Sequence, residues 1–202
     1  GAVTWVNKVL TTDEAITQVN RDSRLLVVDS ILADLDQAIS LLPAASSSAS
    51  MRVHKDVALT FKSRVALYEG TWEKYHKLKA DPFYDQAITD TKIRDYFTQA
   101  RNAANTVMTS GRWTISNNGK PLEDYGKLFI TNDLTTNREV MLWRKYTLAD
   151  NIAHSISKYL STGGGDIGLT LSLVDDYLTR AGAPFNGNIR TQAQATYAAE
   201  LM

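Results

Sequence analysis

The densest group of aromatic and cationic side chains outside a helical pattern consists of Trp143, Arg144, Lys145 and Tyr146. Tryptophan and tyrosine rings stack against flat apolar surfaces such as the faces of sugar rings, and neighbouring polar groups then orient the ligand. The group therefore predicts non-catalytic binding of a ring-shaped ligand. The alternative is that Trp143 packs between a strand and a helix as part of the core.

A second group of rings lies in residues 58–77, ALTFKSRVALYEGTWEKYHK. Its large apolar side chains recur at helical steps of three or four and are Phe61, Val65, Tyr68 and Trp72. Such a stripe is typical of the buried face of a helix, so we expect these rings to fill the core. Tyr75 and His76 lie beyond the stripe, where we expect partial exposure and the only ligand contacts of this stretch.

The sequence offers few groups for catalysis. His54, His76 and His154 are far apart without a metal-binding spacing, and we expect each of them at the surface or at a helix end. The sequence has no nucleophile elbow, phosphate-binding loop or dinucleotide fingerprint. It also has no cysteine, which excludes thiol catalysis, disulfides and zinc sites with sulfur ligands.

Two pairs of carboxylates are close in sequence, Asp34 with Asp36 and Asp175 with Asp176. Helical residues one or two positions apart point to different faces, so neither pair converges on one substrate atom as glycoside hydrolysis requires. We therefore predict a protein that is not an enzyme, with no catalytic residues, no cofactor and no identified metal ligands.

The charge balance limits the possible partners. Lys plus Arg and Asp plus Glu number 22 each among 202 residues, so the formal net charge is zero. Nucleic-acid binding and attraction to an anionic membrane surface both need clustered positive charge, and the sequence has no long basic run. No segment approaches the roughly 18 apolar residues of a membrane-spanning helix.

The first predicted helix begins after Asp22 or Ser23, either of which can cap it, and stops at Pro43. Its apolar residues follow one helical face: Leu25, Val28, Leu32, Leu35, Ile39 and Leu42. This periodicity predicts an amphipathic helix that packs on its neighbours.

Two further helices are predicted, one from about Lys55 with Gly70 near its end, and one over about 91–108 with Gly111 as its cap. The apolar residues of the latter are Ile93, Phe97, Ala100, Ala104 and Val107. Helices of this length with short connections predict a mostly α fold of antiparallel pairs, and their spacing is close to the tetratricopeptide period of about 34 residues.

The chain becomes irregular after Gly111. Residues 138–147 alternate in character and predict a short strand, with Val140, Leu142 and Arg144 on one face and Met141, Trp143 and Lys145 on the other. A short helix is expected after Thr170 or Ser172, and 190–202 are a candidate for another.

Five blocks of the sequence, in this order, resemble the SusD/RagB family. They contain Leu42 and Pro43; Arg64 to Tyr68; Ser110 to Trp113; Tyr125 to Phe129 with Asn137 to Val140; and Leu173 to Tyr177. Together the blocks cover roughly residues 20–183. Each block is short, but their combination and order are specific.

The resemblance implies tetratricopeptide-like helical pairs joined to a loop-rich part with short strands that bears much of the ligand site. Family members are much longer, so we expect residues 1–202 to be a fragment of one SusD-like domain. Its helical repeat part would cover about 20–112 and its irregular ligand-side part about 113–202.

Family members are lipoproteins exposed on the outer membrane, where they capture glycans for a SusC-like TonB-dependent transporter. Any lipid anchor would lie outside this chain, because the chain has no cysteine. By position after the Asn-x-Glu-Val block, Trp143 and Tyr146 are expected to stack on ligand, Arg144 to donate hydrogen bonds, and Tyr159 to make a weaker contact.

The resulting hypothesis is non-catalytic binding of an oligosaccharide or polysaccharide for import. Arg64, Tyr68 and Trp72 would belong to the scaffold. One alternative is a peptide-binding member of the same family, which would rely on an extended cleft and backbone hydrogen bonds. The other is a helical-repeat scaffold that binds only protein partners.

Overall fold

The structure is a computed structural model that describes residues 3–6, 9, 19–44, 50–153, 155–160, 168, 170, 173 and 176–183. The chain divides into two compact units, Gly1–Lys145 and Tyr146–Met202. Within the described residues the fold is mostly helical and contains no strand, in agreement with the predicted class at this level. No described helix is both long enough and apolar enough to span a membrane.

The first unit contains α2 (Arg24–Leu41), α3 (Lys55–Lys79), α4 (Asp90–Met108) and α5 (Pro121–Ile130). The second contains a 3-10 turn, η1 (Leu148–Asp150), and α6 (Ile156–Leu160). The first two predicted helix starts are confirmed, since Ser23 caps α2 by accepting the N–H of Leu26 and α3 starts at Lys55. The third lies within one residue of its predicted start.

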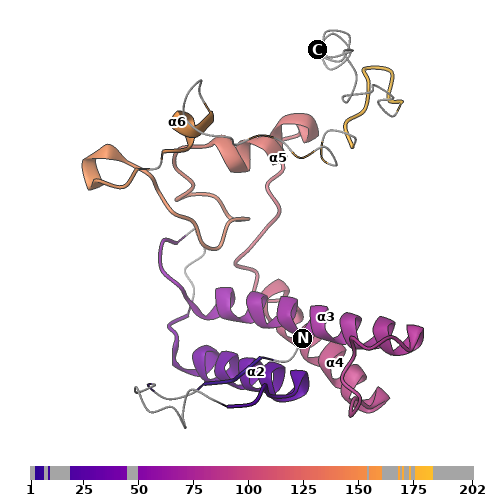
Figure 1. Ribbon diagram of the computed structural model, residues 1–202. Helices are drawn as coiled ribbons and strands as arrows, with labels where there is room; N and C mark the ends of the chain where they lie inside the picture. The colour runs from indigo at the N-terminus through magenta and orange to yellow at the C-terminus, as the bar shows by residue number, and fades with distance from the viewer. Residues whose placement is uncertain are drawn as a thin grey trace. The chain divides into compact units, whose positions relative to one another are not determined.

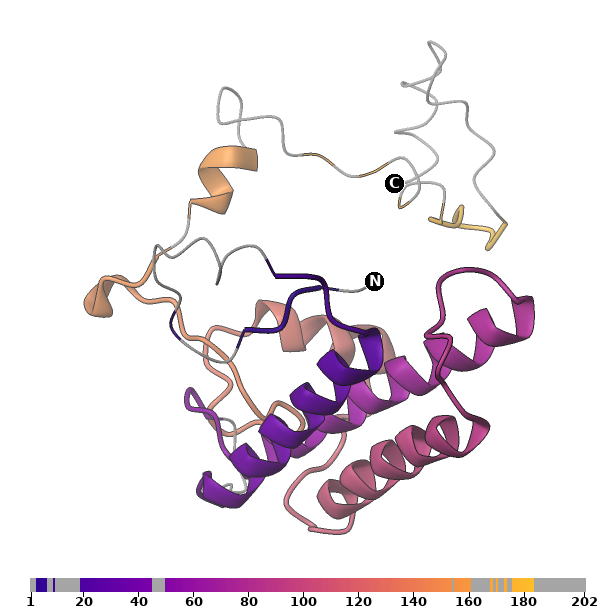
Figure 2. The ribbon, with the colours of Figure 1, turned by 60° about the horizontal axis from the view of Figure 1, so that its bottom comes forward.

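Helix α3 lies between α2 and α4 (Figure 1; Figure 2). Arg24 of α2 pairs with Glu69 late in α3, whereas Asp36 pairs with Lys62 earlier in α3, so these two helices are antiparallel. Lys77 pairs with Asp90 and Ser63 bonds to Ala100, so α3 and α4 are antiparallel as well. Whether this layer repeats as a tetratricopeptide stays a prediction.

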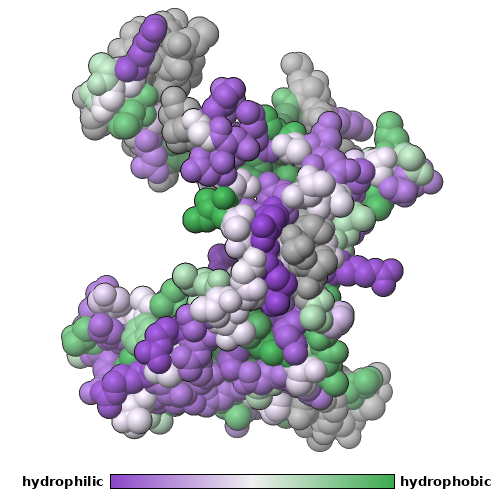
Figure 3. Space-filling model, turned by 180° about the vertical axis from the view of Figure 1, so that it is seen from behind, coloured by the Kyte–Doolittle hydropathy of each residue, from purple (hydrophilic) through white to green (hydrophobic). Residues whose placement is uncertain are grey.

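Apolar residues from all three helices form the core of this layer. The main cluster contains Val28, Leu32, Ala66, Ile88, Ile93, Tyr96 and Ala100. A second, smaller cluster contains Leu59, Ala103 and Val107. The surface of the layer, in the lower part of Figure 3, is largely hydrophilic with separate apolar patches.

The prediction that the apolar stripe of α3 fills the core holds for Val65, which is half-buried and packs against the main cluster, and is wrong for the aromatic rings. The exposed fractions of Phe61 and Tyr68 are 53% and 59%, and Trp72 is only half-buried. The face that α3 buries carries small residues together with the carboxylates of Glu69 and Glu73. Arg24 pairs with both acids, and burial together with Glu69 raises the pKa of Glu73 to about 7, which reduces the negative charge that this face carries inward.

Gly70 does not end a helix, as its position had suggested, but lies inside α3, which continues to Lys79. A Cβ atom at Gly70 would lie 3.0 Å from the ring of Phe97 on α4. The glycine therefore allows α3 and α4 to approach closely, because the Phe97 ring occupies the space that a side chain at position 70 would need.

Replacing Gly70 with valine should lower the free energy of unfolding by about 1–3 kcal/mol, because the added methyl groups overpack the contact with Phe97. Urea denaturation followed by far-UV circular dichroism measures the change. The matched control is Gly126→Val in α5, where an added Cβ meets no atom within 4 Å. Equal effects of the two substitutions would contradict the packing role of Gly70.

Helix α5 was not predicted, because the chain was expected to be irregular after Gly111. Proline is well suited to the first position of a helix, where its missing N–H has no intrahelical partner, and α5 begins at this residue. The missing N–H that interrupts a helix interior therefore costs nothing at this first position, where the fixed φ of proline already suits a helix.

The predicted strand over 138–147 is not present as a strand. The segment makes one isolated parallel bridge, between Leu142 and Ser50, with the N–H of Trp143 donating to the carbonyl of Ser50 at 3.0 Å. The chain bends at 51–52 and enters α3, so no longer ladder forms with this partner. The alternation is nevertheless visible in burial, since Met141, Trp143 and Lys145 are more buried than the residues between them.

Candidate functional site

The four predicted ligand residues are divided between the two units. Trp143 is half-buried and Arg144 is exposed in the first unit. Tyr146 and Tyr159 are 52% and 48% exposed in the second, with Tyr159 on α6. Their joint action on one ligand stays a prediction.

Of the predicted histidines, two are described. His54 is the N-cap residue of α3 and His76 lies in its last turn, so both are at helix ends as expected. His54 is nevertheless buried, with its ring stacked on that of Trp113 at 5.7 Å and its Nε2 atom 3.1 Å from the Met141 carbonyl. It is part of the packing between α3 and the irregular segment. His154 lies outside the described residues.

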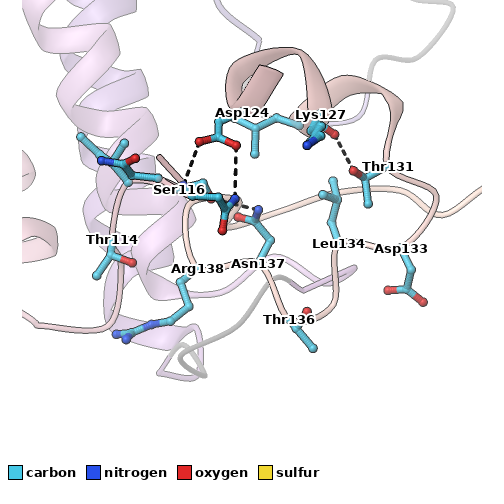
Figure 4. A pocket seen from close by; sticks show the side chains of 14 residues that line it. Thr114, Ser116, Asp124, Lys127, Thr131, Asp133, Leu134, Thr136, Asn137 and Arg138 are labelled. Carbon is cyan, nitrogen blue, oxygen red and sulfur yellow. Dashed lines mark hydrogen bonds between the residues drawn. The ribbon is translucent and has the colours of Figure 1, made fainter. Parts of the chain in front are cut away.

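The first unit contains a polar pocket of about 470 Å³ formed by the arm 114–118, helix α5 and the loop 131–138 (Figure 4). Its polar lining residues are Thr114, Ser116, Asn117, Asn118, Asp124, Lys127, Thr131, Asp133, Thr136, Asn137 and Arg138. Its apolar lining residues are Ile115, Leu128 and Leu134. We call this site the polar pocket.

Asp124, in the first turn of α5, holds the arm against the helix. Its carboxylate accepts the backbone N–H of Asn118 at 2.8 Å and that of Lys120 at 3.2 Å. These hydrogen bonds, chiefly the one from Asn118, place the pKa of Asp124 below its ordinary value. The buried carboxylate therefore stays ionised at neutral pH and fixes one wall of the polar pocket.

Asn137 joins the arm to the loop on the other side. Its side-chain oxygen accepts the N–H groups of Glu139 and Val140 at 2.8 and 3.0 Å, and its Nδ2 donates to the hydroxyl of Ser116 at 3.1 Å. Arg138 follows directly and donates to the carbonyl of Gly111 at 2.8 Å. These contacts link the loop 131–138 to the arm and to the residues that directly follow α4. The wall of the polar pocket that this loop forms is therefore also held in place.

The segment predicted to bind ligand is tied to the rim of the polar pocket. Lys145 donates to Asp133 at 2.9 Å, and Asp133 also accepts the hydroxyl and the N–H of Thr135. The Thr135 hydroxyl and the Lys145 ammonium hold the pKa of Asp133 far below its ordinary value. Trp143 and Arg144 do not line the pocket, but the chain that carries them borders it.

The lining combines hydroxyl and amide groups with three apolar side chains, and its two carboxylates balance its two cations. Such a surface suits a neutral ligand with many hydroxyl groups, which can accept and donate hydrogen bonds in several directions. Thr114 and Thr136 contribute side-chain hydroxyls to which no hydrogen bond is assigned within the described part of the chain.

Sequence reasoning did not identify the polar pocket. The signal was the density of asparagine, aspartate and threonine in 117–118 and 131–137. These residue types bond to nearby backbone N–H groups and thereby shape loops, as Asn117 does with Gly119 and Asp133 with Thr135.

Comparison with protein-family models, with curated proteins and with solved structures returns no match to this chain.

Proposed function

We propose that this chain binds a glycan without acting on it chemically, as part of a nutrient-capture protein of the SusD type. The observation that carries the proposal is the lining of the polar pocket, which combines hydroxyl and amide groups with a few apolar side chains and has no excess charge. A neutral oligosaccharide presents the same combination of hydroxyl groups and apolar C–H faces.

The state of the two carboxylates supports binding over hydrolysis. A general acid for glycoside cleavage needs a raised pKa so that it holds a proton near neutral pH. The pKa values of Asp124 and Asp133 are both lowered, because each carboxylate accepts several hydrogen bonds from its surroundings. Both groups are therefore suited to hold the loops and to accept hydrogen bonds.

The cellular role follows from the family resemblance. The protein would be a lipoprotein exposed on the outer membrane, anchored by a lipid outside this chain, and its partner would be a SusC-like TonB-dependent transporter. A weak affinity at each site is sufficient for such a role, because ligand held next to a transporter has a high effective concentration.

Affinity electrophoresis against a panel of soluble neutral polysaccharides, followed by titration calorimetry with oligosaccharides of the retarding polymer, tests the proposal. Thr136→Phe should fill the polar pocket and weaken binding at least about tenfold, or 1.4 kcal/mol. Thr136 is exposed, so folding should be unaffected. The control is Thr106→Phe, which places the same ring at an exposed position of α4.

Three other results would revise the proposal. Retardation that survives Thr136→Phe but is lost in Trp143→Ala would move the site to the segment predicted from sequence. Binding only to extended peptides would favour the peptide-binding alternative. Failure to bind any glycan or peptide would favour a helical scaffold for protein partners.

A further inference from the structure

The outward face of α3 carries a row of aromatic rings that the core does not use. Tyr68 and Tyr75 are 59% and 55% exposed, and the less exposed rings of Trp72 and His76 lie on the same face. We call these four residues the α3 ring surface. Together with Arg64, Leu67 and Thr71, they line a hollow of about 450 Å³ on the first unit.

The ring of Trp72 is held in one orientation by groups on three segments. Its Nε1 donates to the carbonyl of Phe83 at 2.9 Å, and the guanidinium of Arg24 lies 4.6 Å from its ring centroid. Arg24 is itself fixed by a bidentate pair with Glu69 at 2.6 and 2.8 Å. An exposed ring in a mobile side chain would lose entropy on binding, whereas Trp72 has lost most of that freedom before any ligand arrives.

His76 continues the row and is held in a similar way. Its ring centroid lies 4.1 Å from that of Trp72, and its Nδ1 is 2.6 Å from the carboxylate of Asp81. On the other side of Trp72, the ring of Tyr68 is stacked at 6.0 Å with an interplanar angle of 25°. The three rings therefore form one continuous, preorganised surface.

Two cations lie close to the row: Arg64 lines the hollow itself, and Lys74, which lines a neighbouring hollow, lies beside Tyr75. Arg64 and Lys74 are both exposed, and neither has a salt bridge within the described residues; Lys74 lies 5.6 Å from the ring of Tyr75. The nearby acids are engaged elsewhere, since Glu69 and Glu73 face Arg24 and Asp81 faces His76. The surface therefore combines apolar rings with two exposed cations that form no salt bridge within the described part of the chain.

Arg64 and Lys74 are ten positions apart on α3, which corresponds to about 15 Å along the helix. A ligand that uses both cations and the rings between them must be longer than one sugar, with flat apolar faces and several negative charges. An oligosaccharide of uronic acids has these properties. The rings would take its C–H faces, and the two cations would take its carboxylates.

We propose that the α3 ring surface is a binding site for acidic glycans, separate from the polar pocket. This proposal rests on the proposed function only in that the ligand is again a glycan. The site lies outside the polar pocket and would bind its ligand through charge as well as ring stacking. Tyr68 and Tyr75 stack on the sugar rings, and Arg64 and Lys74 pair with the carboxylates.

Affinity electrophoresis in polygalacturonate and in its fully methyl-esterified form tests this proposal, since the two polymers share a backbone and differ in charge. The full chain should be retarded by the acidic polymer and at least tenfold less by the ester. Arg64→Gln and Tyr68→Ala should each weaken the interaction at least tenfold, whereas Tyr68→Phe keeps the ring and should retain it.

The matched controls are Arg101→Gln, an exposed cation on α4, and Tyr125→Ala, an exposed ring on α5; neither should change the retardation. Equal retardation by both polymers, no retardation by either, or indifference to Arg64→Gln and Tyr68→Ala would overturn the proposal. Thr136→Phe separates the two sites, because it should weaken binding of neutral glycans at least about tenfold and leave the polygalacturonate result unchanged.

Discussion

Asp56→Ala is expected to lower the free energy of unfolding of the first unit by about 3–5 kcal/mol, the usual cost of removing one partner from a buried ion pair. Asp56 is fully buried near the start of α3. Its carboxylate accepts two hydrogen bonds from Arg112, at 2.7 and 2.8 Å, and one from Nε1 of Trp113 at 2.7 Å. Truncation leaves both donors without their acceptor and removes the main link between α3 and the segment after α4.

The pH dependence of this link has a defined sign. Burial opposes ionisation of Asp56, but the hydrogen bonds from Arg112 and Trp113 outweigh it, so its pKa lies below the ordinary value of 3.8. The stabilisation is therefore complete above that value and is lost as the pH falls through the lowered pKa. Native protein should show this loss at acidic pH, and Asp56→Ala should not.

Urea denaturation at pH 7 measures the effect, with Asp36→Ala as the control. Asp36 also forms a short ion pair, with Lys62 at 2.6 Å, but its side chain is 58% exposed, so its removal should cost less than about 1 kcal/mol. Similar losses for the two substitutions would show that burial does not determine the strength of the Asp56 contacts.

Arg24→Met should destabilise the first unit by about 3–5 kcal/mol at pH 8, because it leaves two carboxylates inside the helical layer without their cation. Arg24 lies 2.6 Å from Glu69 and 3.4 Å from Glu73, and both glutamates are almost completely buried. Methionine keeps most of the volume of the arginine stem, so the effect reports mainly on the lost charge and hydrogen bonds.

The loss in Arg24→Met should be much smaller at pH 5. In the native protein, burial together with the neighbouring Glu69 already raises the pKa of Glu73 from 4.5 to about 7. A folded-state pKa above the unfolded value means that this group favours folding most at or below pH 4.5, and that its contribution is lost as the pH rises toward 7. Removing Arg24 should raise the pKa of Glu73 further, because the arginine charge lowers it in the native protein, and this steepens the same dependence.

Urea denaturation of the native chain, Arg24→Met and Glu73→Gln at pH 5 and pH 8 checks this account. Glu73→Gln keeps the shape of the side chain and removes its charge. At pH 8 the variant should therefore be more stable than the native chain by about 2–3 kcal/mol, and this difference should be smaller at pH 5. A loss in Arg24→Met that is the same at both pH values would mean that Arg24 acts through packing on Trp72 rather than through the glutamates.

The sequence by itself determined the first three helices and most of their bounds. These features depend on short-range chemistry: Ser23 accepts the N–H of Leu26, and the apolar periodicity of α4 predicts buried Ile93, Ala100 and Val107. Groups that act within one or two helical turns leave a signal that can be read without the fold.

The tertiary structure decided which face of α3 is buried. The helix has an aromatic stripe and an acidic row, and on intrinsic hydrophobicity the aromatic stripe should turn inward. The acidic row turns inward because Arg24, 45 positions before Glu69, supplies the compensating charge from another helix. Periodicity detects a stripe but contains no information about a charge partner on a distant helix.

The polar pocket also depends on the tertiary structure. Asn137 reaches Ser116 across 21 positions, and Arg138 reaches Gly111 across 27, so the walls meet only after the chain has folded back along α5. The sequence marks the polar residues of these loops, but each could equally point to solvent. Long-range hydrogen bonds bring them around one cavity, which is the physical reason that the site could be recognised only from the structure.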